Sequence, residues 1–290
     1  MYKLTTWFLA IRPKTLSLSM TPVLVGSTLA WVDACDCNLI VFLITLGTAL
    51  AIQVGTNLYN DAVDFERGTD TPNRLGPKRV TAQGWMNGAI IKRGALLSFS
   101  AAFIGGVYLT WIGGWPILIL GVLSLVAGFA YTGGAKPIAY SPSGELFVLI
   151  FFGLAAVMGS YYLQTGNVSA SSAYIGVAIG LLASAVMLVN NYRDLDTDRQ
   201  CGKLTLVHYL ERRQSRVLFG ILLTLPFLLP MVLQQTRAWL VVGALPISLY
   251  LILRFVREPP GQGFNTILAQ TVQLQLAYGA LLSAGLLLST

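Results

Sequence analysis

The stretch VFLITLGTALAIQVGTNLYNDAVDFERGTD, residues 41–70, decides the fold of this chain. Its first half is an apolar run, and about 20 such residues are what a helix needs to cross the hydrocarbon core of a bilayer. Its second half holds four of the chain's 12 acidic residues, Asp61, Asp64, Glu66 and Asp70. Ionisable groups beside the hydrocarbon are costly unless they are paired or functional. The stretch therefore predicts a membrane-spanning helix that ends in a functional site.

The whole chain shares this apolar character. Of its 290 residues, 55% are hydrophobic and 11% are charged, whereas about a quarter of the residues of a soluble domain are charged. Apolar runs of spanning length recur from end to end, which predicts an all-α, polytopic membrane protein with one transmembrane domain over residues 1–290. The N-terminal segment carries Arg12, Pro13 and Lys14 and no small-residue cleavage site, so we expect no removable signal peptide.

Charged residues predict how the helices are oriented in the membrane. If the chain forms nine spans, 18 of its 19 basic residues fall on one side of the bundle and only Arg237 falls on the other. Because excess Lys and Arg mark cytoplasmic loops, we expect the N-terminus and all long loops in the cytoplasm and the C-terminus outside. The same rule accounts for the net charge of +7 without nucleic-acid binding. The nine predicted spans lie at about 15–33, 39–60, 94–112, 115–132, 145–163, 172–193, 215–234, 237–255 and 267–288.

Two of the predicted spans end in matching acidic segments. The second ends in NLYNDAVD (57–64) and the sixth in NNYRDLDTD (190–198), so each closes with Asn-x-x-x-Asp and a further Asp within four residues. At about 100° per residue, Asn57, Asp61 and Asp64 fall within about 60° of one another on a helix. Gln53, one turn earlier, continues that face into the membrane. The match between the segments suggests a faint internal duplication.

The sixth span presents an equivalent stripe, made of Asn191, Asp194 and Asp198 and bordered by Asn190. Asp196 points elsewhere, toward solvent or a nearby arginine. Like charges at these spacings repel one another, and a divalent cation relieves the repulsion; hard oxygen ligands favour Mg²⁺ with a phosphate-bearing substrate. Ordinary solvated helix ends are the alternative for either segment alone. Two matched segments in a chain so poor in acids favour the metal.

Basic residues surround both acidic segments. With a metal they form a cationic site for a multiply charged anion, for which a diphosphate is the natural candidate, although loop charge is the alternative for any single base. Lys136 is the only strong base in YTGGAKPIAY (131–140), a loop rich in Gly, and Lys14 lies at the start of the first span. The predicted substrate-contacting residues are Lys14, Gln53, Arg67, Tyr131, Lys136, Asn190, Asn191, Arg193 and Lys203.

Four segments give the chain a family resemblance: RPKTLSLSMTPVLVGS (12–27), NLYNDAVDFERGTDTPNRLGPKR (57–79), YTGGAKPIAYSPSGELFVLIFFGLAAVMGSYYLQ (131–164) and NNYRDLDTDRQCGKLTLVHYLE (190–211). With them the chain resembles the UbiA superfamily of intramembrane aromatic prenyltransferases, which carry two Asp-rich motifs after their second and sixth helices. Asp64 comes one residue earlier than in the general first motif. That shorter spacing is similar to the branch that acts on 1,4-dihydroxy-2-naphthoate.

The resemblance implies Mg²⁺-dependent transfer of a polyprenyl group from polyprenyl diphosphate to 1,4-dihydroxy-2-naphthoate, with loss of CO₂, in menaquinone biosynthesis. It implies a bacterial plasma (inner) membrane location, a site that faces the cytoplasm and an apolar cavity for the isoprenoid tail. Lys136, Arg193 and Lys203 would support the phosphate oxygens. The catalytic acids would be Asp61, Asp64, Asp194 and Asp198. Together with the amide of Asn57 they would hold two Mg²⁺ ions.

Two alternative functions remain open from the sequence. Another aromatic acceptor, such as 4-hydroxybenzoate, would use the same diphosphate site. A cation-coupled transporter is a different class of protein, and it would place ionisable residues near the middle of its spans. Here the acids gather at one end of the predicted bundle, which favours the enzyme.

Overall fold

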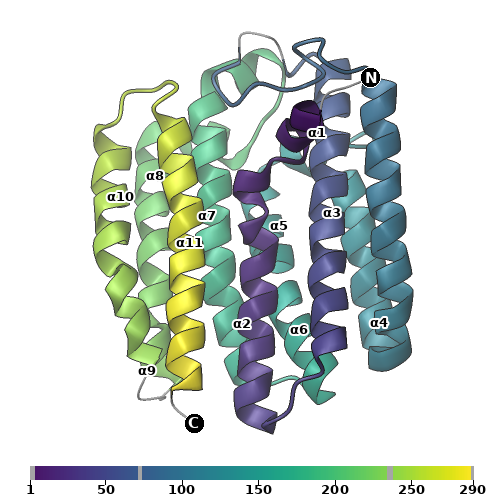
Figure 1. Ribbon diagram of the computed structural model, residues 1–290. Coiled ribbons are helices and arrows are strands. Elements are labelled where there is room, and N and C mark those ends of the chain that lie inside the picture. The colour runs from purple at the N-terminus through teal and green to yellow at the C-terminus, as the bar shows by residue number, and fades with distance from the viewer. Residues whose placement is uncertain (1–3, 71–73, 234–237, 289–290) are drawn as a thin grey trace.

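The computed structural model describes residues 4–70, 74–233 and 238–288 (Figure 1). Lys3 and Arg237, which both enter the charge distribution above, lie outside the described residues. Within these ranges all regular structure is helical and no strand occurs, so the predicted all-α class is confirmed. The principal helices are α1 Leu4–Ile11, α2 Ser17–Ala34, α3 Leu39–Glu66, α4 Gly88–Ala130, α5 Gly144–Leu149, α6 Ala156–Thr165, α7 Ala170–Gln200, α8 Leu206–Thr224, α9 Leu229–Leu233, α10 Leu245–Arg257 and α11 Phe264–Leu287.

Polar caps set where the long helices begin. The Asn38 side chain accepts hydrogen bonds from the backbone of Ile40 and Val41 at the start of α3, and Asn87 does the same at the start of α4. Ser169 and Ser172 form a reciprocal capping box at the start of α7. Such side chains satisfy backbone N–H groups that have no partner within the helix.

Several helices depart from the predicted spans. The helices α3 and α7 run past the predicted ends, to Glu66 and Gln200, so both acidic segments are helical. The predicted third and fourth spans form α4, which is broken at Gly114, where φ is 66° and ψ is −153°. Among the described residues, six helices are long and apolar enough to cross a membrane, or seven if α1 and α2, bent by 50°, form one span.

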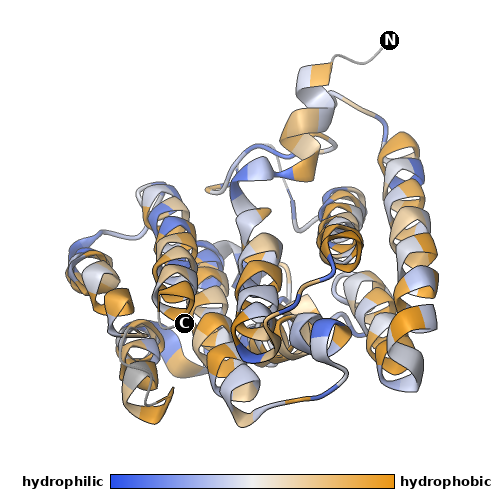
Figure 2. Cartoon of the chain, turned by 60° about the horizontal axis from the view of Figure 1, so that its bottom comes forward, coloured by the Kyte–Doolittle hydropathy of each residue, from blue (hydrophilic) through white to orange (hydrophobic). Residues whose placement is uncertain are grey.

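The helix α7 lies at the centre of the bundle, and most of its residues are buried. It packs closely on the π-helical segment Ile150–Ala155 (η3), which joins α5 to α6. Glycines permit that approach, because a Cβ on Gly153 would lie 2.4 Å from the carbonyl oxygen of Gly176. On the outside of the bundle, large apolar side chains such as Trp111, which is 89% exposed, face the surroundings. Hydrophobic residues recur along the length of the helices (Figure 2), as expected for helices that cross an apolar bilayer.

Candidate active site

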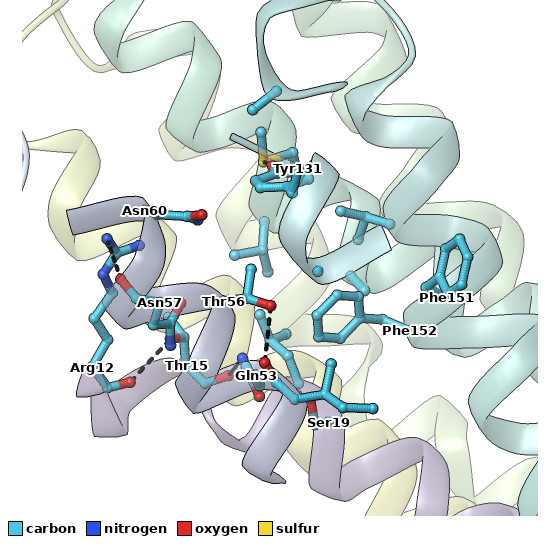
Figure 3. Close-up of a pocket in the computed structure, with 18 of the residues that line it drawn as sticks. Arg12, Thr15, Ser19, Gln53, Thr56, Asn57, Asn60, Tyr131, Phe151 and Phe152 are labelled. Carbon is cyan, nitrogen blue, oxygen red and sulfur yellow. Dashed lines mark hydrogen bonds between the residues drawn. The ribbon is translucent and has the colours of Figure 1, made fainter. Parts of the chain in front are cut away.

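A cavity of about 840 Å³ runs through the part of the bundle formed by α2, α3, α4, α5, α6, α7 and α11. Its deeper part is apolar and is lined by side chains such as Phe151, Phe152, Leu109 and Ile117. Its other end is polar and holds residues of both acidic segments. Figure 3 shows Arg12, Asn57 and Asn60 on one side of this cavity, with Tyr131 and the two phenylalanines across from them.

The first acidic segment contributes Asn57 and Asp64 to the cavity lining. Asn57 is held in place because its Nδ2 donates a 3.0 Å hydrogen bond to the carbonyl oxygen of Ile11. Asp64 accepts a 2.9 Å hydrogen bond from the Tyr140 hydroxyl. Asn60 also lines the cavity, and its Oδ1 accepts a hydrogen bond from the Thr132 hydroxyl. The sequence reasoning missed Asn60, although it lies one turn before Asp64 in the same motif.

Asp61 lies away from the lining of this cavity. Its carboxylate is buried and accepts hydrogen bonds from the backbone N–H groups of Val80, at 3.1 Å, and Thr81, at 2.9 Å. The Thr81 hydroxyl donates to the same carboxylate. In this conformation Asp61 therefore fixes the loop that follows α3 to the end of the helix.

The second acidic segment brings Asp194 and Asp198 to the cavity. Asp194 is held from two directions, because Arg193 donates to both of its oxygens, at 2.8 and 2.5 Å, and an Arg74 nitrogen lies 3.8 Å away. Asp198 pairs with the Lys203 ammonium at 3.1 Å. Asp196 points away and pairs with Arg212, which confirms the orientation expected for it.

Asn190 and Asn191, which are neighbours on α7, have different surroundings. Asn190 lines the cavity and accepts a 2.9 Å hydrogen bond from Arg193. Asn191 is buried on another side of α7, where its Nδ2 donates to Glu145 Oε1 at 2.8 Å. Of the residues predicted to contact substrate, Asn190, Arg193 and Lys203 thus lie at the polar end of the cavity, whereas Asn191 does not line it.

Of the other residues predicted to contact substrate, three line the cavity and two do not. Lys14, Gln53 and Tyr131 line the cavity, and Gln53 donates to the carbonyl oxygen of Thr15 at 2.7 Å. Arg67 and Lys136 are exposed and lie outside the lining. Arg67 instead donates to the carbonyl oxygen of Gly134, which ties the end of α3 to the loop that carries Lys136.

The loop after α3 adds charges that the sequence reasoning undervalued. Asp70, which was not among the site residues predicted from the sequence, is only 8% exposed and lines the cavity, where it pairs with Arg74 at 2.5 Å and Arg79 at 3.1 Å. Burial opposes ionisation of Asp70, but these arginines outweigh it and hold the pKa of Asp70 below its usual range. Burial and the neighbouring Arg79 lower the pKa of Arg74 to about 10. In the sequence, the cluster of basic residues after the second predicted span was the signal that could have indicated these charges at the site.

The polar end therefore has an excess of confined positive charge. Burial lowers the pKa of Lys203, yet Asp198, Asp64 and Asp194 outweigh burial and raise that pKa above its usual value. Arg12, which was not among the predicted site residues, lines the cavity and has a buried Nε without a hydrogen-bond partner. Unpartnered, buried cationic donors of this kind suit a multiply charged anion.

The donor chemistry of the cavity fits a hard divalent cation. Asp64, Asp194 and Asp198, with the amide oxygens of Asn57 and Asn190, bring carboxylates and amides of the type that bind Mg²⁺ to one space. Each carboxylate is at present held by a base or a hydroxyl. Among the described residues, no three acidic, His or Cys side chains form a ready-made metal group. The side chains therefore fit Mg²⁺ by the type of their donor atoms, but among the described residues they are not already arranged around a metal position.

Comparison with known sequences gives one consistent family. A family model described as the UbiA prenyltransferase family matches residues 19–263. The 1,4-dihydroxy-2-naphthoate octaprenyltransferase of Haemophilus influenzae is 35% identical over 99% of this chain and 97% of its own length. Proteins of the same name from Bacillus subtilis and Escherichia coli are each 34% identical, over 96% and 98% of this chain and 91% and 95% of their own lengths.

Solved structures give the same fold at lower sequence identity. A UbiA homologue from Archaeoglobus fulgidus, bound to DMAPP and Mg²⁺, has a TM-score of 0.66 at 14% identity and covers 96% of this chain and 99% of its own. The apo structure of a UbiA homologue from Aeropyrum pernix has a TM-score of 0.69 at 14% identity, over 96% of this chain and 98% of its own. At this identity the likeness establishes the arrangement of helices.

Proposed function

This chain belongs to the UbiA prenyltransferase family, and on that premise we propose that it transfers a polyprenyl group from its diphosphate to 1,4-dihydroxy-2-naphthoate in menaquinone biosynthesis. The observation that carries the proposal is the near full-length similarity, at 34–35% identity, to relatives named for that reaction. A prenyltransferase family argues against the cation-coupled transporter that the sequence left open.

The diphosphate is proposed to bind at the polar end of the cavity. Arg12, Arg74 and Lys203 line this end and would bind phosphate oxygens, with Arg193 behind Asp194. These bases stabilise the negative charge that develops on the diphosphate as it leaves the prenyl group. Arg67 and Lys136, both exposed, would reach the diphosphate only if their loops moved inward.

Asp64, Asp194 and Asp198, with Asn57, are the proposed Mg²⁺ ligands. Bound Mg²⁺ would neutralise the diphosphate and make it a better leaving group. Asp61 completes the set predicted from the sequence, but to act as a ligand it would have to release the backbone of Val80 and Thr81. Its proposed contribution in the present conformation is to hold the loop after α3 beside the site.

The apolar part of the cavity is the proposed site of the isoprenoid tail. Phe151, Phe152 and Leu120 line it, and such walls keep water from the allylic cation that forms as the carbon–oxygen bond to diphosphate breaks. The ring carbon of the naphthoate that bears the carboxylate attacks this cation. Departure of CO₂ then returns the bonding electrons to the ring and restores its aromaticity.

An acceptor competition tests the proposed function. Purified protein supplied with one long prenyl diphosphate and Mg²⁺ should prenylate dihydroxynaphthoate, with the product mass lower by CO₂ than the simple adduct. Product formation should stop when the metal is chelated. Prenylation of 4-hydroxybenzoate, without reaction of dihydroxynaphthoate, would instead establish the alternative acceptor.

We also propose nine membrane passes, with the N-terminus and the active site on the cytoplasmic side of a bacterial plasma membrane. The break at Gly114 supports two passes within α4, since 43 residues exceed what one pass needs at 1.5 Å per residue. The basic residues gathered around the polar end of the cavity support the cytoplasmic orientation.

A further inference from the structure

Three distant segments of the chain meet at Asn265, the second residue of α11. Its Oδ1 accepts a 2.8 Å hydrogen bond from Arg193 Nη1 on α7. Its Nδ2 donates a 2.9 Å hydrogen bond to the carbonyl oxygen of Leu75, which lies 190 positions away in the loop after α3. Asn265 also lines the cavity. One amide therefore connects α11, α7 and the cationic loop.

The contact with Arg193 completes the hydrogen bonding of a buried cation. The Arg193 side chain is fully buried, and its guanidinium already donates to Asp194 and to Asn190. The hydrogen bond from Arg193 Nη1 goes to the Oδ1 of Asn265. A buried charged donor that loses its partner carries the full cost of its desolvation, so Arg193 would move to find another.

The contact with Leu75 holds the loop directly on the acidic segment of α7. At the next residue, Gly76, a Cβ would lie 2.6 Å from Arg193 Nη2 and 2.8 Å from Arg74 Nη2. The backbone at Gly76 therefore rests on both guanidinium groups, and Arg74 reaches to 3.8 Å from Asp194. Asn265 is the hydrogen-bonded link between this loop and α11.

The packing of the neighbouring residue keeps Asn265 in place at the start of α11. The preceding residue, Phe264, is fully buried, and its ring centroid lies 5.0 Å from that of Tyr192 and 5.2 Å from that of Phe255. This aromatic cluster fixes the first turn of α11 independently of the amide. Truncating Asn265 should therefore leave α11 in place and free only its two partners.

We propose that Asn265 is a positioning residue for the diphosphate site, which sets Arg193 and the Arg74-bearing loop against Asp194. The proposal rests on the proposed function, because it takes these bases to bind the diphosphate. It assigns Asn265 to recognition of the diphosphate and not of the aromatic acceptor. Small displacements of binding groups are costly for transfer reactions, because the reacting geometry must be held closely.

The kinetic test uses Asn265→Ala and Asn265→Asp in the full-length protein. A hydrogen bond to a charged group contributes about 1.5–3 kcal/mol, so Asn265→Ala should raise KM for prenyl diphosphate roughly tenfold or more and KM for the acceptor less than about twofold. Asn265→Asp keeps the acceptor for Arg193 but has no donor for Leu75, so an intermediate KM is expected. Gln270→Ala, which removes another arginine-bonded amide on α11, is the matched control and should match wild type.

Trypsin cleavage after Arg74 gives a readout that does not depend on activity. Arg74 is only 10% exposed in its side chain, so this cut should be slow in wild type and in Gln270→Ala. It should be faster in Asn265→Ala, because a freed loop opens more often. If Asn265→Ala does not fold, Gly76→Ala should give the same faster cleavage and raised KM, since it pushes the loop away from Arg193.

The two tests separate the proposals. If wild type does not prenylate dihydroxynaphthoate, the proposed function fails, while the cleavage rates still report whether Asn265 holds the loop. The positioning role is overturned if Asn265→Ala matches Gln270→Ala in both KM for prenyl diphosphate and cleavage after Arg74. Equal rises in both KM values would also overturn it, because they would indicate a general structural defect.

Discussion

Asp61 and Asp64 lie one turn apart on α3, yet they have different surroundings. Asp64 lines the cavity, and a hydroxyl hydrogen-bonds to it. Asp61 lies outside the cavity lining, and two backbone N–H groups donate to its carboxylate. A carboxylate held by several donors is already satisfied, whereas Asp64 keeps capacity for a cation. The same residue type therefore supports the loop at one position and can bind a ligand at the other.

Substitution by asparagine should separate these roles. Asp61→Asn places an amide donor against the N–H groups of Val80 and Thr81, so we expect a loss of about 1–3 kcal/mol of stability and a lower Tm in detergent. Asp64→Asn keeps an oxygen that can accept the hydrogen bond from the Tyr140 hydroxyl, so its free energy of unfolding should change by less than about 1 kcal/mol, while Mg²⁺-dependent turnover should be abolished. An unchanged Tm for Asp61→Asn, together with lost turnover, would instead identify Asp61 as a metal ligand.

Asp70 should give the stability a measurable dependence on pH. Its two arginine partners hold the folded pKa of Asp70 below the usual range of an aspartate, so its ion pairs stabilise the protein above the unfolded pKa and are lost as the pH falls through the folded pKa. Asp70→Asn leaves Arg74 and Arg79 without their carboxylate, and breaking such buried pairs costs about 3–5 kcal/mol. Melting curves from pH 7 to pH 3 should show the variant less stable at pH 7, with the difference narrowing toward pH 3. A constant difference would contradict this assignment.

At the scale of elements, close packing of α7 against the π-helical segment positions the acidic end of α7. The contact depends on small residues, since a Cβ on Gly153 would meet the backbone of both Gly176 and Gly180. Small residues at such spacing let helix backbones approach in a membrane, where burial of apolar surface supplies little driving force between helices. Phe151 and Phe152 in the same π-helical segment line the cavity, so this packing also shapes its apolar part.

Gly153→Ala should therefore destabilise the bundle. The added methyl meets backbone atoms that cannot rotate away, and overpacking of this kind costs about 1–3 kcal/mol. Thermal melting in detergent measures the effect. Gly47→Ala on α3 is the control, because nothing lies within 4 Å of its Cβ position, and it should be neutral or slightly stabilising. Equal melting temperatures for the two variants would show that the helices separate without cost.

At the scale of the whole molecule, charged and apolar side chains are gathered at different ends of one cavity. The cavity joins a polar end, with Arg12, Lys14 and Lys203, to an apolar interior. Both acidic helix ends and the loop after α3 meet at that polar end. A charged substrate head and an apolar tail can therefore be held at the same time, each in a medium that suits it.

The proposed nine-pass topology predicts where the C-terminus lies. With an odd number of passes and a cytoplasmic N-terminus, alkaline phosphatase fused after Thr290 should be active and a green fluorescent protein fused there should be dark. Fusions after Gly261, between α10 and α11, should give the opposite pattern and serve as the control. Fluorescence from the C-terminal fusion would mean an even number of passes and would contradict the proposal.

Much of the fold could be predicted because its signals are local. Apolar runs, Asn caps and the basic loops each lie within a few tens of residues, so the helical class and the acidic ends of α3 and α7 follow from the sequence. Of the site, Asn57, Asp64, Asp194 and Asp198 were predicted and do line the cavity. Helix periodicity fixes the angle between two side chains but does not say which direction faces the cavity.

By itself the sequence determined the membrane class, the family and the types of side chain available for a diphosphate and a metal. Only the tertiary structure decided that Asp61 faces a loop, that Asp70 is buried between arginines, and that Asn265 joins segments 190 positions apart. The physical reason is that these contacts depend on how the helices pack. That packing is set by many weak contacts between distant segments, and no single stretch of the chain records it.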